Sequence, residues 1–172
     1  MNNDKRRLIE GWIDKASNQL HVAQQHSKSY VHYSEAIQAA QECIELSVKS
    51  VLSILHITFS PSHGWNQDKK QFINIAEQIQ KKRLIGKLEK QYLNHSINLP
   101  RLLFLVNFWS HFYITAKYGF EAGYLASAKD LFKKEEADLS IQHARECYDA
   151  ASQLRYLDKD KLALLLTTKN KG

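Results

Sequence analysis

Glycine and proline, the residues that most often end regular structure, are scarce in this sequence. Only 6 glycines and 2 prolines occur among 172 residues, roughly 5% of the chain against a usual share of about 12%. All-β sandwiches and barrels need many turns, so the scarcity excludes them. Because 44% of the residues are apolar, the chain can bury a core. The composition, rich in strong helix formers, therefore predicts an all-α fold.

Cysteine and long apolar runs are also lacking. Cys43 and Cys147 lie far apart and form no C-x-x-C spacing, which excludes a disulfide scaffold. No stretch reaches about 18 uncharged apolar residues, and the polar segment 1–7 lacks the apolar region of a signal peptide. We therefore expect a cytoplasmic protein without a membrane span.

Motifs that hold phosphates or metals through a fixed local pattern are absent. The sequence contains neither G-x-G-x-x-G, nor G-x-x-x-x-G-K-[ST], nor H-E-x-x-H. His21, His26 and His32 fall on different faces of a helix at 100° per residue. We accordingly predict no metal site and no bound cofactor.

Apolar residues recur at steps of three and four in five segments, as in amphipathic helices. The segments are approximately 5–27, 33–57, 72–92, 100–117 and 137–151. The third could form one kinked helix or two short ones. The pattern predicts a single domain over residues 1–172, an up-and-down bundle of about five helices with its core within about residues 5–155. The tail, 156–172, either docks as a short helix or frays.

The fourth segment is apolar nearly all round and begins after Asn98, with Pro100 in its first turn. Such a helix is usually central in a bundle or lies in a subunit interface. Trp65, in a loop rich in helix-breaking residues, is expected to cover the core rather than to bind a ligand.

The net charge of +6 is concentrated in residues 68–90, which hold seven basic and three acidic residues. This basic strip could attract phosphate groups. We favour the alternative, a solvated helix face, since the strip lacks interleaved aromatic residues for stacking on bases. Glu45 and Lys49 stand four apart and predict a surface ion pair worth tenths of a kcal/mol.

Four segments in order carry a family resemblance. They are the long alanine-rich helix at 33–55 with Glu45 and Lys49 at its centre, the loop 61–64 containing His63, the segment 116–119, and the start of the last helix at 135–137. Together these segments resemble the HEPN family of small helical-bundle proteins.

The resemblance implies a bundle that dimerises, binds a nucleotide or RNA, and often works beside a nucleotidyltransferase in a toxin–antitoxin pair. It also implies the candidate binding residues. Lys49 belongs to the family's E-x-x-x-K pattern, and His63 stands in the post-helix loop. Lys117 and Tyr118 stand where members often have Arg-Tyr. A lysine retains the charge there but loses the planar fork that grips phosphate.

Many members of the family are metal-independent ribonucleases with an Arg followed, after four to six residues, by a His. Here no Arg is followed by a His at that spacing. Arg101 and His111, the pair that comes nearest to it, are ten residues apart. We therefore predict a non-catalytic binding module without catalytic residues. Two alternatives stay open. One is a ribonuclease with a degenerate site, such as His111 with Lys117. The other is a structural protein that dimerises through residues 102–113.

Overall fold

Helices form almost all the regular structure of the computed structural model, which describes residues 3–60, 65, 69–121 and 125–167. Those of 12 residues or more are α1 (Asn3–His26), α2 (Tyr33–Ile54), α3 (Lys69–Lys81), α5 (Leu99–Ser110) and α8 (Lys134–Arg155). The shorter elements are η1 (Tyr30–His32), α4 (Leu84–Lys90), α6 (Tyr113–Tyr118), α7 (Ala128–Leu131), α9 (Lys159–Leu166) and the antiparallel strands β1 (Phe120–Glu121) and β2 (Leu125–Ala126). The all-α class is confirmed, and the short helices raise the number above the predicted five.

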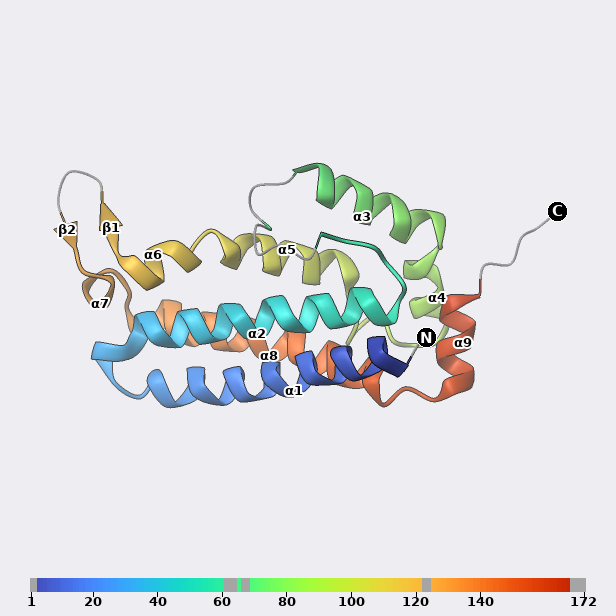
Figure 1. Ribbon diagram of the computed structural model, residues 1–172, viewed down its shortest axis with the longest axis horizontal. Helices are drawn as coiled ribbons and strands as arrows, with labels where there is room; N and C mark the ends of the chain where they lie inside the picture. Colours follow the sequence, from blue (N-terminus) through green and yellow to red (C-terminus); the bar gives the residue numbers. More distant parts are fainter. Residues whose placement is uncertain (1–2, 61–64, 66–68, 122–124, 168–172) are drawn as a thin grey trace.

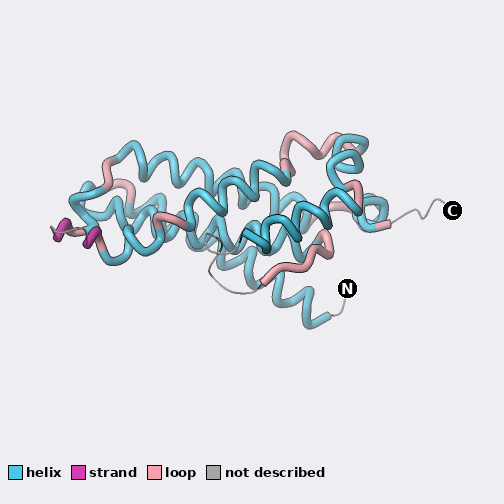
Figure 2. The backbone as a smooth tube through the Cα atoms, turned by 90° about the horizontal axis from the view of Figure 1, so that it is seen from above, coloured by secondary structure: helices cyan, strands magenta, loops and turns pink. Residues whose placement is uncertain are grey.

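Apart from α3, the long helices run alternately along one axis, as in an up-and-down bundle. Figure 1 shows α1 leading away from the end where α4 and α9 lie, α2 returning, α5 and α6 leading away again, and α8 returning. Seen from above in Figure 2, the two short strands stand at one extremity of this axis. At this same end, η1 between α1 and α2 contacts α7 between α6 and α8.

The central helix is α2, in which 17 of 22 residues are buried. It packs along its length against α1 and α8 and also contacts α5 and α6. The buried stripe of α1 advances by alternating steps of four and three residues, through Ile9, Ile13, Ala16, Leu20 and Ala23. Each four-residue step rotates about 40° beyond a full turn around the helix axis. A stripe that stays on one face of the helix must therefore alternate steps of three and four residues.

The predicted helix 100–117 is divided into two. Its start is as predicted, because the Asn98 side chain accepts a hydrogen bond from the Arg101 backbone N–H at 3.1 Å. However, α5 ends at Ser110, and α6 runs from Tyr113 to Tyr118. Gly119 follows α6 as its C-cap, with a φ of 82° that suits glycine. Neither helix is central, since α2 holds that place, and one face of α5 and α6 remains exposed.

The third predicted segment forms two short helices joined at Arg83, whose φ of 52° is left-handed. The C-terminal tail docks through α9, where Leu165 is buried. Lys87 of α4 fixes this helix by donating to the carbonyl oxygens of Leu165 and Thr167, each at 2.8 Å. As far as Thr167, the tail thus takes the docked form of the two predicted alternatives, and residues 168–172 lie outside the described residues.

Candidate ligand-binding site

A stripe of polar residues on α2 is buried in the bundle. Gln41, Glu45 and Lys49 follow one another at four-residue steps, and Glu45 and Lys49 are each only 5% exposed. The Lys49 Nζ lies 2.7 Å from the Glu45 Oε1, and the Gln41 Nε2 donates to the Glu45 Oε2 at 3.3 Å. The prediction of a surface pair was wrong, because α2 is covered on nearly all sides and leaves the pair no solvated face.

Glu45 also borders a small hollow of about 150 Å³ between α1, α2 and α6. Its lining residues are Lys15, Gln41, Glu42, Glu45, Leu46 and Tyr113. The Lys15 Nζ lies 2.5 Å from the Glu42 Oε1 at its edge, and this hydrogen-bonded carboxylate raises the pKa of Lys15. Small-molecule sites usually measure about 300–1,000 Å³, so this hollow has room for one end of a ligand only.

The second part of the site is the short helix α6, which carries the predicted residues Lys117 and Tyr118. The Gln38 side chain of α2 donates to the Ala116 carbonyl oxygen at 2.8 Å and fixes α6 on the bundle. The Lys117 Nζ lies 5.1 Å from the Tyr118 ring centroid and 5.7 Å from that of Tyr113. Hydrogen bonding to Tyr118 raises the pKa of Lys117, so its charge persists at neutral pH.

The structure brings only some of the predicted residues together. Lys117 and Tyr118 are adjacent, and Tyr113 connects them to the hollow beside Glu45. Lys49 is buried in its ion pair and does not line the hollow. His63 lies outside the described residues. Tyr113 and Gln41 were missed by the sequence analysis, although the four-residue spacing from Gln41 to Glu45 and Lys49 was visible in it.

The basic strip does not join this site. Figure 1 shows α4 and α6 towards opposite ends of the bundle. Two of its lysines serve the fold, since Lys87 holds α9 and Lys82 donates to the carbonyl oxygens of Leu55 and His56 at the end of α2. Burial lowers the pKa of both lysines. The strip is therefore no continuous free cationic surface.

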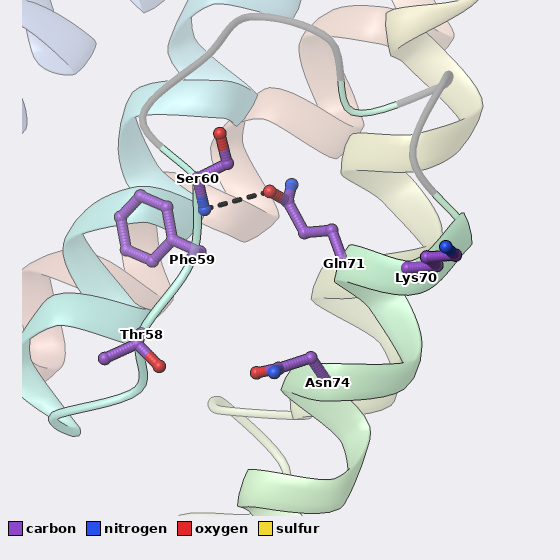
Figure 3. A pocket seen from close by; sticks show the side chains of 6 residues that line it. All are labelled: Thr58, Phe59, Ser60, Lys70, Gln71 and Asn74. Carbon is purple, nitrogen blue, oxygen red and sulfur yellow. Dashed lines mark hydrogen bonds between the residues drawn. The ribbon is translucent and has the colours of Figure 1, made fainter.

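A third location, the extended segment 57–60, is tied to α3 by glutamine side chains. Figure 3 shows the hollow between them and the hydrogen bond, 2.9 Å long, that the Ser60 backbone N–H donates to the Gln71 Oε1. The Gln78 amide accepts from the Thr58 N–H at 2.8 Å and donates to its carbonyl oxygen at 2.9 Å. These amides are occupied in holding the segment. Trp65 is fully buried beneath it, as predicted.

Comparison with known proteins decides the family. The family model described as the HEPN domain matches residues 9–154, which is most of the chain and extends from α1 to the end of α8. The chain belongs to the HEPN family. No curated protein and no solved structure matches it. The resemblance drawn from the four segments is thus confirmed, and α9 lies beyond the matched HEPN region.

Two further properties of this HEPN chain bear on its site. Among residues 3–60, 65, 69–121 and 125–167, no cluster of three or more His, Cys, Asp or Glu side chains could hold a metal ion. Within the same residues, no helix has the length and apolar character needed to cross a membrane. The groups of the described residues that this HEPN domain offers to a ligand at the site are therefore the Lys117 ammonium, the rings of Tyr113 and Tyr118, and the Gln41 amide.

Proposed function

We propose that this HEPN domain is a non-catalytic binding module that takes a phosphate-bearing ligand, a nucleotide or RNA, at α6. The observation that carries the proposal is the exposed Lys117 ammonium within 6 Å of the ring centroids of Tyr113 and Tyr118. No carboxylate of the described residues forms an ion pair with it. Lysine binds phosphate as a point charge, and aromatic side chains stack on bases.

The residues of α2 support this site from beneath. Tyr113 touches both the Lys117 ammonium and the hollow that Glu45 borders. Lys49 holds Glu45 in place, and it therefore acts as a positioning residue rather than as a ligand contact. Tyr118 is 66% exposed, so its ring is accessible to a base. The ligand would lie across α6 and insert at most one end into the hollow.

The missing Arg-to-His spacing supports binding without cleavage. The family's association with a nucleotidyltransferase-type partner, as in a toxin–antitoxin pair, belongs to the same proposal. The proposal also includes a cytoplasmic location, which is consistent with the two buried cysteines, since they form no disulfide.

The binding test compares Lys117→Ala and Tyr118→Ala with the wild type, using ATP and a short labelled single-stranded RNA. Loss of a charged contact or of a stacked ring should weaken binding about tenfold. For RNA, Lys117→Ala should also reduce the slope of log affinity against log salt by about one contact. Lys159→Ala, an exposed lysine on α9, is the matched control.

Unchanged affinity in Lys117→Ala would refute the proposed site. Cleavage of the RNA by the wild type in the presence of a chelator would instead establish the ribonuclease alternative. The same incubation, read on a gel, tests that outcome.

A specific surface also favours a homodimer. Phe104, Phe108 and Phe112 form a row on α5 and its end, with ring centroids 5.8 and 5.3 Å apart. Phe104 is 54% exposed, and Ile114 of α6 is exposed beside the row. Exposed apolar rows of this kind commonly mark protein interfaces. We infer that two copies pair through this face, and Phe108→Glu should convert a dimer into a monomer in light scattering. A wild-type monomer at micromolar concentration would contradict this inference.

A further inference from the structure

A larger hollow, of about 490 Å³, lies where α3, α4 and the start of α5 meet. Its lining residues are Ala76, Ile79, Gln80, Arg83, Ile85, Gly86, Pro100 and Leu103. The volume falls within the usual range of small-molecule sites, which are mainly apolar with a few polar groups that fix orientation. Here the lining is apolar except for the Gln80 amide and the Arg83 guanidinium.

Gly86 forms part of this wall without a reason in the fold. It stands inside the seven-residue helix α4, where alanine would be more stable. Its φ is not positive, since Gly119 is the glycine of the described residues with that conformation. A Cβ built on Gly86 would meet nothing within 4 Å. The missing side chain therefore leaves this wall of the hollow open.

Arg83 also lines this hollow, and it has a backbone conformation that is unfavourable for a residue with a side chain. It is a non-glycine residue with φ 52° and ψ 38°, a left-handed conformation that disfavours a side chain. Its guanidinium forms no hydrogen bond or ion pair with the described residues. This conformation ends α3, as it does at His56 after α2 and at Tyr92 after α4, so the unpaired guanidinium rather than the backbone distinguishes Arg83. The chain thus maintains a free cation at the edge of an apolar hollow.

The walls of the hollow include apolar surface that the fold leaves uncovered. Ile85 is 44% exposed, and Leu103 is only partly buried against the core. A ligand with an apolar body would remove both from water. A volume of about 490 Å³ suits a small molecule better than a long helix of a partner.

We propose that this hollow binds a small amphiphile, with an apolar body against Ile79, Ile85 and Leu103 and one carboxylate on the Arg83 guanidinium. The fork of an arginine matches a carboxylate in two parallel hydrogen bonds. The Gln80 amide can donate to the same group. The site is separate from α6, as α4 lies towards the other end of the bundle (Figure 1).

The test measures binding of dodecanoate, below its micelle concentration, to the full chain by titration calorimetry. Dodecanol is the uncharged probe of the same length. The wild type should bind dodecanoate at least tenfold more tightly than dodecanol. Arg83→Gly should reduce dodecanoate binding to the level of dodecanol, and Arg83→Lys should restore part of the difference. Gly86→Leu should abolish the binding of both probes by filling the hollow.

Stability measurements separate these effects from damage to the fold. Arg83→Gly relieves the left-handed strain and Gly86→Ala improves α4, so neither should lower the melting temperature. Gly86→Ala should retain most of the binding, because a methyl group occupies little of the hollow. Equal affinity of the wild type for the two probes, absence of binding to both, or full binding by Gly86→Leu would overturn the proposal. Lys117→Ala should leave dodecanoate binding unchanged, so this test does not depend on the function proposed for α6.

Discussion

The buried ion pair of α2 allows a quantitative prediction. Lys49→Met removes the ammonium that lies 2.7 Å from the Glu45 carboxylate and leaves that carboxylate in a place with almost no access to water. Removing one partner of a buried pair costs about 3–5 kcal/mol. In a domain of this size each kcal/mol lowers the melting temperature by about 2–4 °C. We expect a decrease of roughly 6–20 °C, measured by circular dichroism and confirmed by urea unfolding.

Two controls make the argument specific. The double variant Glu45→Leu with Lys49→Met should recover most of the loss, because apolar residues of similar volume often replace a buried pair without cost. Lys134→Met breaks another i,i+4 pair, with Asp138, that is exposed on α8. It should change the free energy of unfolding by less than about 0.5 kcal/mol. If Lys49→Met cost no more than Lys134→Met, the pair would be hydrated and the reasoning from burial would be wrong.

Three further predictions concern titration, thiol reactivity and glycine. Burial lowers the pKa of His143, whose Nδ1 accepts a hydrogen bond from the Trp109 indole at 3.0 Å. Below pH 6.5 the unfolded chain therefore binds a proton at this histidine more readily than the folded chain does. The contribution of neutral His143 to the free energy of unfolding is fully present above pH 6.5 and decreases as the pH falls below it. His143→Gln should flatten this decrease in melts between about pH 5 and 6.5, and a curve parallel to the wild type would refute it. Burial raises the pKa of Cys43 to about 12 and that of Cys147 well above its usual value. A thiol reagent at pH 8 should thus label both only after unfolding, and stoichiometric labelling of the native protein would contradict this. Gly119→Ala should destabilise by about 1–2 kcal/mol because of its φ, and effects on stability near zero in thermal melts would show that the turn is relaxed.

Much of the secondary structure followed from local patterns. The cap at Asn98 depends on a side chain and a backbone N–H three residues apart, and so could be predicted from a few neighbouring residues. The stripes of α2 and α8 were equally clear, since buried positions on a helix repeat at three and four residues. The division of 100–117 at Ser110 was not predicted, because an apolar composition carries no signal for where a helix must turn to follow its neighbours.

The candidate site was predicted only in part. The resemblance selected Lys117 and Tyr118, which lie together on α6. It also selected Lys49, which proved to be buried rather than available to a ligand. Tyr113 was missed, since its value comes from standing between Lys117 and the hollow beside Glu45. Such relations join elements that are far apart in the chain.

The sequence by itself determined the helical class, the family, the approximate places where the helices of 12 residues or more begin, and the absence of the Arg-to-His spacing. These depend on composition, on periodicity and on neighbours within about one turn. Only the tertiary structure decided that Glu45 and Lys49 are buried, that the basic strip and Lys117 lie apart, and that Arg83 and Gly86 border one hollow. The physical reason is that burial and proximity are set by how helices pack. Packing depends on the shapes of all the contacting faces at once.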